Sequence, residues 1–333
     1  MTDPAAVYRD AIVIDATCPL LQDPKYLADY KAGGVTALCP TVGSVEGAAE
    51  GFKNVAKWLR LIRERDDLIL IERATDFETA KRNGQIGIII HFQGADPIEA
   101  DLDLLDGYHA MGLRMQQLCY NVKNRIGDGC EEPTDSGLSK LGVALVKRLD
   151  ALRIVLDCSH TGYRTTMDAI EHATRPVVIS HANVKAIKES PRNLRDDQIK
   201  AIAATGGLIG MVGFPAFVAD KPKPTLDDLI DHLDYVVQMV GIDHVGLGID
   251  YYGAQHPYST PEQAKAIYDG WVAGGQWSAG YPAPPYHYPQ GIETPDKLPN
   301  IAPGLARRGY GDDDIRKIVG GNWVRVFREV WGA

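Results

Sequence analysis

Residues 153–183 read RIVLDCSHTGYRTTMDAIEHATRPVVISHAN, and the pattern in this stretch decides the fold. An apolar run at 153–160 is followed by a polar stretch with helical spacing and then by a second apolar run at 175–183. Runs that are apolar throughout and rich in β-branched residues are typical of parallel strands with helices on both faces of the sheet. The stretch therefore predicts a strand–helix–strand unit of a parallel sheet.

The same alternation extends outward from this unit in both directions. Further apolar runs are followed by amphipathic helical patterns and lie at 11–16, 35–42, 68–72, 87–94, 113–121, 207–214 and 243–250. Repeated units of this kind without a GxGxxG turn favour a closed barrel over an open doubly wound sheet. We therefore expect an α/β fold, a (β/α)8 TIM-like barrel of the metal-dependent-hydrolase type. A single domain over residues 1–333 fits the length.

Residues 251–303 interrupt the alternation with Gly, Pro and aromatic residues, as in GQWSAGYPAPPYHYPQGIE. The segment is too long for a simple connection. It is either a surface excursion packed by its own aromatic side chains or a lid over the barrel mouth. We favour the lid, because the segment directly follows a strand end, where barrel active sites are built. The final stretch predicts a closing amphipathic helix pair that is broken at Gly320–Gly321.

The composition excludes several classes of function. The net charge is -9 and no Lys/Arg-rich stripe is present, which argues against a nucleic-acid partner. The five cysteines are dispersed and form no CxxC pair, as is typical of reduced thiols in a cytoplasmic protein. The N-terminus lacks the features of a signal peptide, and no apolar stretch approaches the length of a membrane span. We expect a cytoplasmic protein with a small-molecule substrate and no membrane partner.

Polar side chains stand at the carboxyl ends of the expected strands, where a parallel barrel brings them around one cavity. Each has an ordinary structural explanation by itself, since a lone His is often a packing residue and an Asp after a strand is often a helix N-cap. Their coincidence at equivalent positions favours a functional site. These residues are Gln93, Tyr120, His160, His181 and Asp250.

His160 and His181 lie on adjacent expected strands and form a plausible half-site for zinc, since neutral imidazole is a common zinc ligand. Asp250 is a candidate third ligand or a general base for metal-bound water. Asp157 either orients an imidazole or binds backbone groups. Arg192 either clamps a substrate carboxylate or anchors its loop, and the sequence does not separate these two roles.

His91 lies two residues before Gln93 and so points to the same side of its strand, one layer deeper. It either reaches a metal or is a buried, hydrogen-bonded core residue, and we favour the second. The GxSxG, GxxxxGK[ST] and HExxH motifs are absent, and nothing besides proximity links Cys158 to His160 in a dyad.

Three segments resemble the membrane (renal) dipeptidases, metallopeptidase family M19. They are DCSHTGYRTTMDAI, PVVISHANVKAIKESPRNLRDDQIKAIAATGGLIG and DHLDYVVQMVGIDHVGLGIDYYG. The resemblance implies a distorted barrel, commonly dimeric, that hydrolyses dipeptides at a two-zinc centre. It implies that His160 and His181 bind one zinc ion. It also implies that Arg192 binds the substrate carboxylate and that Asp250 acts in proton transfer near the substrate amino group.

The chain departs from the family pattern at several positions. Thr17 and Pro19 stand where the family carries the His and Asp of an HxD pair, and Gln93 replaces the bridging glutamate. Tyr120 replaces the histidine that polarises the scissile carbonyl, although its hydroxyl can still donate to an oxyanion. A neutral amide is a poorer zinc ligand than a carboxylate. Cys18 is a conceivable substitute, because thiolate binds zinc well.

These departures predict one zinc ion or none, held by His160, His181 and either Gln93 or Asp250. The first hypothesis is a dipeptidase-like hydrolase acting on a dipeptide or related small amide, with Asp250 and Tyr120 catalytic and Arg192 and Tyr120 contacting substrate. The second is a divergent member with non-hydrolytic or metal-independent chemistry on a small carboxylated molecule. The third is a non-enzymatic binding protein, which a wide separation of the two histidines would favour. Family members are commonly dimeric, so we expect a homodimer.

Overall fold

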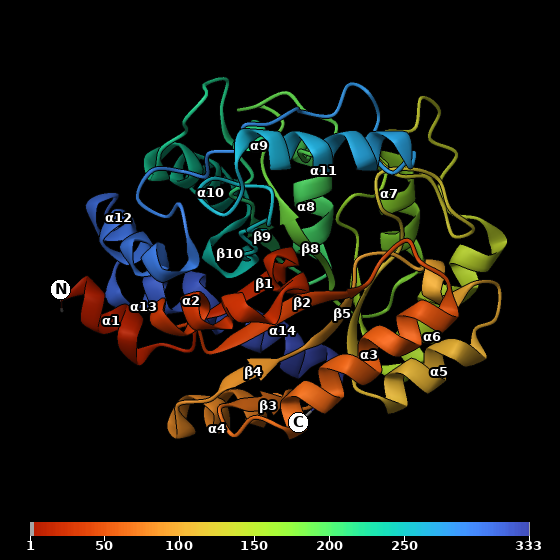
Figure 1. Cartoon of the computed structure of the whole chain (residues 1–333), viewed down its shortest axis with the longest axis horizontal. Coiled ribbons are helices and arrows are strands. Elements are labelled where there is room, and N and C mark those ends of the chain that lie inside the picture. The colour runs from red at the N-terminus through yellow and green to blue at the C-terminus, as the bar shows by residue number, and fades with distance from the viewer. Residues whose placement is uncertain (1–2, 333) are drawn as a thin grey trace.

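A computed structural model describes residues 3–332 of the chain and shows a parallel barrel surrounded by helices (Figure 1). All strand pairs are parallel. The strands are β1 (Ile14–Cys18), β2 (Ala37–Gly43), β3 (Leu68–Leu70), β4 (Ile86–Ile88), β5 (Ile90–Phe92), β6 (Leu113–Gln117), β7 (Val155–Asp157), β8 (Val177–Ala182), β9 (Ile209–Met211) and β10 (Val245–Leu247). The expected α/β barrel is confirmed, and each expected strand region contains at least one strand.

The sheet runs in the order β10-β9-β8-β7-β6-β5-β2-β4-β3, and β1 pairs with β2. β2 is shared, because its first half pairs with β4 and its second half with β5. The expected strand at 87–94 is therefore two strands separated at Ile89, which raises the total to ten. The barrel closes where the Asp250 backbone N–H donates to the Thr17 carbonyl at 3.1 Å.

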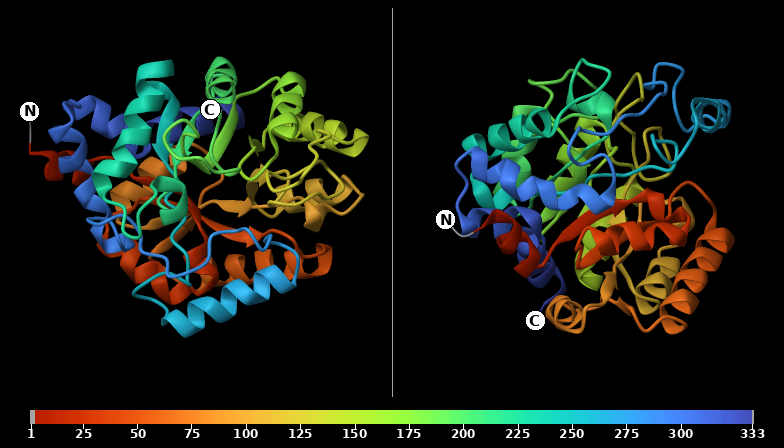
Figure 2. Two further views of the ribbon diagram at one scale, coloured as in Figure 1. Left: turned by 90° about the horizontal axis from the view of Figure 1, so that it is seen from above. Right: turned by 60° about the vertical axis from the view of Figure 1, so that its left-hand side comes forward.

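Helices cover the outside of the barrel, and the chain alternates between strand and helix over most of its length (Figure 2). Strand residues are buried on both faces, which explains why their sequences are apolar without alternation. The helices are α1 (Pro4–Asp10), α2 (Leu27–Ala32), α3 (Ala48–Arg63), α4 (Thr75–Asn83), α5 (Asp103–Ala110), α6 (Lys140–Leu152), α7 (Tyr163–His172), α8 (Asp196–Ala204), α9 (Pro215–Val218), α10 (Leu226–Val240), α11 (Pro261–Ala273), α12 (Ile301–Arg307), α13 (Asp312–Arg316) and α14 (Asn322–Trp331).

The segment 251–303 contains helix α11, which crosses the top of the molecule in Figure 1. The helix begins at a capping box in which the Thr260 hydroxyl accepts from the Gln263 backbone N–H. Beyond the helix, Trp277 stacks on Trp271 at 5.6 Å and on Tyr281 at 4.3 Å between ring centroids. The excursion is thus packed by its own aromatic side chains.

The C-terminal helices α13 and α14 are joined by a π-helical turn at Lys317–Gly321, as the glycine pair predicts. Glycine is required at Gly320 because a Cβ there would lie 2.2 Å from the Ile12 carbonyl oxygen. The close approach lets α14 pack against the barrel, where the Trp323 indole donates to the Leu247 carbonyl at 3.0 Å. This contact ties the end of the chain to β10.

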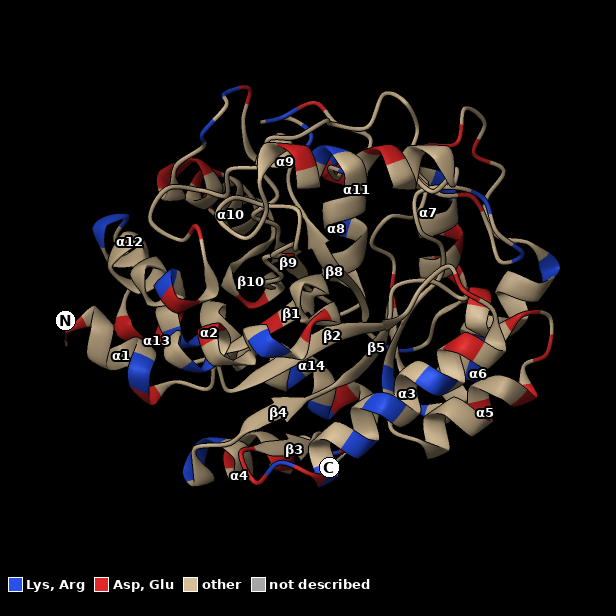
Figure 3. Cartoon of the chain, viewed as in Figure 1, with Lys and Arg blue, Asp and Glu red and all other residues tan. Residues whose placement is uncertain are grey.

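Lys and Arg residues are interspersed with Asp and Glu over the surface helices seen in Figure 3. The picture agrees with the absence of a basic stripe in the sequence. Among residues 3–332, no helix combines the length and the apolar character that a membrane crossing needs.

Candidate active site at the strand ends

Most of the expected site residues meet at the carboxyl ends of the strands. Gln93, Tyr120, His160 and Asp250 line one cavity of about 40 Å³. The remaining walls come from β2, from the loops after β1, β2 and β9 and from the excursion, namely Pro19, Gln22, Thr41, Ser44, Phe214, Tyr252, Trp271, Trp277 and Tyr281. His181 lies behind this layer and is fully buried. The residues that follow the expected strands in the sequence therefore lie around one site, as their positions predicted.

His160 is held in place by three neighbours. Its Nδ1 lies 2.6 Å from the Asn121 Oδ1, and its Nε2 lies 2.7 Å from the Nε2 of His181. Its ring stacks on Tyr120 with centroids 4.2 Å apart. Burial lowers the pKa of His160 well below the usual range, and the nearby Arg192 charge lowers it further. The imidazole is neutral at physiological pH.

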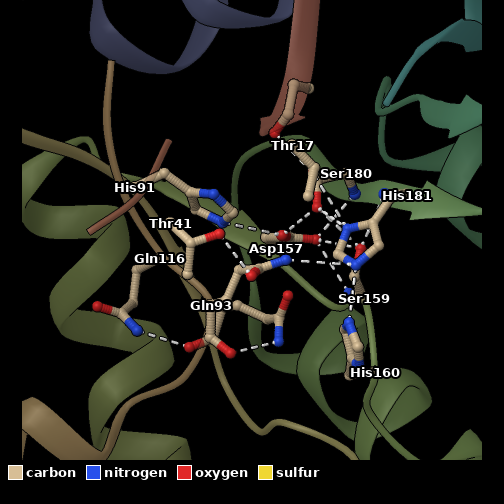
Figure 4. Close-up of polar contacts among 12 residues, drawn as sticks. Thr17, Thr41, His91, Gln93, Gln116, Asp157, Ser159, His160, Ser180 and His181 are labelled. Carbon is tan, nitrogen blue, oxygen red and sulfur yellow. Dashed lines mark hydrogen bonds and ion pairs between the residues drawn. The ribbon is translucent and has the colours of Figure 1, made fainter. Parts of the chain in front are cut away.

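His181 occupies the centre of a hydrogen-bonded cluster, which Figure 4 shows. Its Nδ1 lies 2.8 Å from the Ser180 hydroxyl and 3.1 Å from the Thr17 hydroxyl. Its Nε2 faces His160 and also lies 3.4 Å from the Gln93 Nε2. Burial, followed by the Arg192 charge, lowers the pKa of His181 well below its usual range. Both ring nitrogens therefore already have partners within the protein.

Asp157 fixes the strands that carry the two histidines. Its carboxylate accepts hydrogen bonds from the backbone N–H and hydroxyl of Ser159 and from those of Ser180, at 2.5–2.9 Å. Burial alone would raise its pKa, but His91 and the Ser180 hydroxyl hold the pKa down to about 2. Both roles considered for Asp157 are present, because it binds backbone groups and positions His181 through Ser180.

His91 is fully buried, as expected of a core residue. Its Nε2 lies 3.4 Å from the Asp157 Oδ2, yet neither ring nitrogen makes a hydrogen bond. The expectation of a buried core histidine is confirmed, and the polar contact of His91 is with the Asp157 carboxylate. His91 contacts Asp157 and does not line the cavity.

Gln93 is oriented by β2 and β6, the two strands that pair with β5. Its Oε1 accepts from the Thr41 hydroxyl at 2.7 Å, and its backbone carbonyl accepts from the Gln117 side chain at 2.6 Å. The amide oxygen is therefore already engaged. This contact directs the Nε2, and not the oxygen, towards His181.

Asp250 and Tyr120 present polar groups to the cavity. The Asp250 backbone has a φ of 62°, a left-handed conformation that residues other than Gly rarely adopt. Loss of solvation raises the pKa of Asp250 to about 8, with Asp15 adding to the rise and Arg192 opposing it. Burial also raises the pKa of Tyr120, whose hydroxyl accepts from the Trp277 indole at 3.2 Å.

Arg192 is buried, with 4% of its surface exposed, and it does not line the cavity that contains Asp250. Its Nη2 donates to the His181 carbonyl at 3.3 Å, and its guanidinium lies 5.4 Å from the Phe217 ring centroid. Its Nε has no hydrogen-bond partner, and within residues 3–332 it makes no salt bridge. Arg192 and His160 both line a second cavity of about 260 Å³.

Several residues that contact the site were not predicted from the sequence. Asn121 directly follows Tyr120 and Ser180 directly precedes His181, so their proximity was available from the sequence. Thr41 lies inside β2, two residues before the end of that strand. The contact between Trp277 and Tyr120 could not be predicted from the sequence, because the two residues are 157 positions apart.

The side chains present do not fit the two-zinc centre implied by the resemblance. Thr17 is a hydrogen-bond partner of His181, and Pro19 carries no donor atom for a metal. Cys18 is buried and donates to the Asp15 carbonyl at 3.3 Å, and burial raises its pKa well above the usual range. Among residues 3–332, no group of three or more His, Cys, Asp or Glu side chains is arranged to hold a metal ion.

The histidine pair also differs from a chelating pair for one zinc ion. Two nitrogens bound to one tetrahedral zinc at about 2.0–2.1 Å stand about 3.3 Å apart. The two Nε2 atoms are 2.7 Å apart, which is the spacing of a hydrogen bond. In this arrangement one imidazole donates to the other.

A parallel barrel with polar residues at the carboxyl ends of its strands is typical of barrel enzymes of many kinds, and the comparisons with known proteins identify the family. The sequence profile of the membrane dipeptidases (peptidase family M19) matches residues 40–267 and 279–332. The chain belongs to this family.

Individual relatives agree with this placement. An amidohydrolase from Pseudomonas aeruginosa is 32% identical, with 99% of this chain and 100% of that chain covered and a TM-score of 0.89. An uncharacterised protein of the pqqA 5′ region of Klebsiella pneumoniae is 29% identical over 78% of this chain and 87% of its own length. An uncharacterised dipeptidase of Schizosaccharomyces pombe is 28% identical over 79% of this chain, which spans 58% of that relative.

Proposed function

We propose that this protein hydrolyses the amide bond of a dipeptide or a related small carboxylated amide, with at most one metal ion. The observation that carries the proposal is Arg192, a buried guanidinium with a free Nε and no carboxylate partner in residues 3–332. A buried cation of this kind is stabilised by a bound anion, and guanidinium matches the geometry of a carboxylate. Membership of a dipeptidase family supports the same class of substrate.

The protein's own side chains account for the proton transfers of hydrolysis. Water attacks the amide carbonyl carbon, the C–N bond breaks, and the proton lost by water is delivered to the leaving nitrogen. Asp250 is suited to carry this proton, because its raised pKa of about 8 makes it a stronger base than an ordinary carboxylate. Tyr120 lines the same cavity, and its hydroxyl can donate a hydrogen bond to the developing oxyanion.

The segment 251–303 acts as a lid in this proposal. The cavity of about 40 Å³ has room for about three water molecules and not for a dipeptide. Trp271, Trp277 and Tyr281 of the segment form part of the wall. Substrate entry therefore requires these side chains to move away from Tyr120.

The competing proposal is non-hydrolytic or metal-independent chemistry on a small carboxylated molecule. It is favoured by the hydrogen bond between His160 and His181, whose geometry is not that of a chelate. A wide separation of the two histidines would have favoured a non-enzymatic binding protein. Their Nε2 atoms are 2.7 Å apart, so this observation does not support that alternative.

The deciding experiment combines metal analysis with a dipeptide panel. Protein purified without chelator is measured by plasma mass spectrometry and assayed against dipeptides of L and D residues, with and without Zn²⁺, Mn²⁺ or Co²⁺. We expect hydrolysis and at most one metal equivalent per chain. Absence of hydrolysis under every condition would overturn the hydrolase proposal, and two equivalents per chain would overturn the metal count.

We further propose a cytoplasmic homodimer within a single-domain organisation. The free state of all five cysteines supports a reducing compartment, and the family resemblance supports the dimer. Light scattering after size exclusion tests the dimer, and fractionation of the source cells tests the location. A monomer at micromolar concentration contradicts the first, and recovery outside the cytoplasm contradicts the second.

A further inference from the structure

The cavity of about 260 Å³ beside His160 has no role in the proton transfers described above. Three segments that follow strands form its walls, namely residues 129–135, 158–163 and 191–198. His160 lines both this cavity and the smaller one that contains Asp250. A molecule bound at the histidine pair could therefore extend into the larger space.

Two arginine side chains without carboxylate partners line this cavity. Arg192 is buried and its Nε is free. Arg195 is held over the Tyr163 ring at 4.6 Å, and the Tyr163 hydroxyl donates to Asp197 at 2.7 Å. Within residues 3–332, no acidic side chain forms a salt bridge with either guanidinium. Arg195 is exposed at the edge of the cavity, and the contact with the Tyr163 ring leaves its N–H donors available.

The acidic residues of the wall are already engaged with backbone groups. Asp135 accepts from the N–H of Gly137 at 3.1 Å and of Arg164 at 2.5 Å. Glu132 accepts from the N–H of Lys123 at 2.6 Å. Asp135 is thus held at the first turn of α7 and Glu132 at Lys123, and within residues 3–332 neither carboxylate forms a salt bridge with Arg192 or Arg195.

The remaining polar groups of the wall add one more donor. Gln198 is 5% exposed, and its Oε1 accepts from the Arg195 backbone N–H at 3.1 Å. This bond leaves the Gln198 Nε2 as the free end of the amide. Lys185 also lines the cavity but pairs with Glu189 at 3.0 Å.

We propose that this cavity binds a second carboxylate, so that the preferred substrate carries an acidic side chain on its carboxyl-terminal residue. The main-chain carboxylate binds Arg192, and the side-chain carboxylate binds Arg195 and the Gln198 amide. The inference rests on the proposed function, because it names the substrate class of that site. Bidentate pairing of guanidinium with carboxylate supplies the selectivity over an uncharged side chain.

Calorimetric binding of two nearly isosteric ligands tests the proposal. N-acetylglutamate and N-acetylglutamine differ by one negative charge, and chromatography before and after the titration checks that neither amide bond is cleaved. We expect the wild-type protein to bind N-acetylglutamate about two- to fivefold more tightly, because Arg195 is exposed. Arg195→Gln should bring this ratio close to one, and Arg195→Lys should restore part of it.

Arg164→Gln is the matched control, because Arg164 is exposed on α7, lies outside the cavity wall and loses the same charge. The control should keep the wild-type ratio. Equal binding of the two ligands by wild type, or an equal loss in Arg164→Gln, would overturn the proposal.

Hydrolysis assays separate this inference from the function on which it rests. A preference for N-acetylglutamate in a protein that cleaves no dipeptide would overturn the proposed hydrolysis and leave the acidic subsite standing. Equal kcat/KM for alanyl-alanine and alanyl-glutamate would overturn the acidic subsite and support the hydrolase.

Discussion

At the scale of single residues, hydrogen bonds stand where the family resemblance implies metal ligands. The Thr17 hydroxyl lies 3.1 Å from the His181 Nδ1, and the Thr41 hydroxyl binds the Gln93 amide oxygen at 2.7 Å. His160 and His181 bind each other at 2.7 Å. These polar groups satisfy one another, so the site keeps its shape without an ion bridging the strands.

The pH dependence of catalysis tests the role of Asp250. Its pKa of about 8 lies above its ordinary value, so the basic carboxylate is the minor form at neutral pH. We expect kcat/KM for a dipeptide to rise about tenfold per pH unit up to about 8 and then to level off. Asp250→Asn should lose about 10²- to 10⁴-fold in kcat, with no such rise. A flat wild-type profile between pH 6 and 8 contradicts this role.

Replacing Asp157 tests the support of the histidine pair. Asp157→Asn removes the charge that binds Ser159 and Ser180 and leaves amide hydrogens facing their donors. We expect the free energy of unfolding to fall by about 3 kcal/mol or more, measured by urea denaturation. Asp10→Asn is the control, because Asp10 is exposed, and it should change stability by less than about 0.5 kcal/mol. Equal effects of the two variants refute the supporting role.

The site could be predicted from sequence as a set of positions but not as a set of contacts. Gln93, His160 and Asp250 follow apolar strands, and parallel topology alone brings such positions together. The direction of each side chain depends on partners that no pattern marks, such as Asn121 for His160. The proximity of His160 and His181 was therefore predictable from the sequence, but the hydrogen bond between them was not.

At the scale of elements, the excursion 251–303 is the part that could not be predicted. Its aromatic residues show no strand or helix period outside α11, and its contacts with the barrel come from distant segments. Two hydrogen bonds join it to the loop after β6. The Trp277 indole donates to the Tyr120 hydroxyl at 3.2 Å, and the Ser278 N–H donates to Glu131 at 2.8 Å.

The bond between Trp277 and Tyr120 gives a test of lid closure. Trp277→Phe keeps an aromatic ring for stacking and removes the indole N–H. Loss of one hydrogen bond of about 1 kcal/mol should speed amide hydrogen exchange in 274–282 severalfold. Exchange in β7 should stay unchanged and serves as the internal control. Unaltered exchange in 274–282 would show that this bond does not hold the segment.

At the scale of the whole molecule, the barrel was predictable because its strands are buried on both faces and read as continuous apolar runs. Strand ends were less predictable. The run 87–94 is divided at Ile89, whose N–H donates to Leu38 while the flanking strands pair in separate sheet segments. Periodicity cannot locate such a division, because all residues around it are equally buried.

Global stability should depend on pH through Asp15, a fully buried carboxyl inside the barrel. Burial raises its pKa to about 7, so the folded state retains a proton that the unfolded chain releases above its ordinary pKa. Stability from this group is therefore fully present at low pH and decreases between about pH 4 and 7. The decrease is on the order of 4 kcal/mol, since each tenfold change in acidity is worth about 1.4 kcal/mol.

Asp15→Asn tests this dependence, because asparagine keeps the acceptor for the Ile249 N–H and does not ionise. Urea denaturation of wild type and variant at pH 4.5 and pH 7 measures it. The difference in unfolding free energy between the two pH values should shrink in the variant. If the difference in unfolding free energy between the two pH values is the same in the variant, other titratable groups cause the pH dependence of stability.

His160 and Asp250 both adopt left-handed backbone conformations with φ of 62°. A non-glycine residue held in this region costs roughly 1 kcal/mol, and glycine adopts it without strain. His160→Gly and Asp250→Gly should therefore relax the backbone at the points where they remove the functional side chains. Selection for thermal robustness alone would favour glycine at these two sites. An imidazole and a carboxyl at these two positions therefore come with a cost in backbone strain, as expected if the site proposed here uses their side chains.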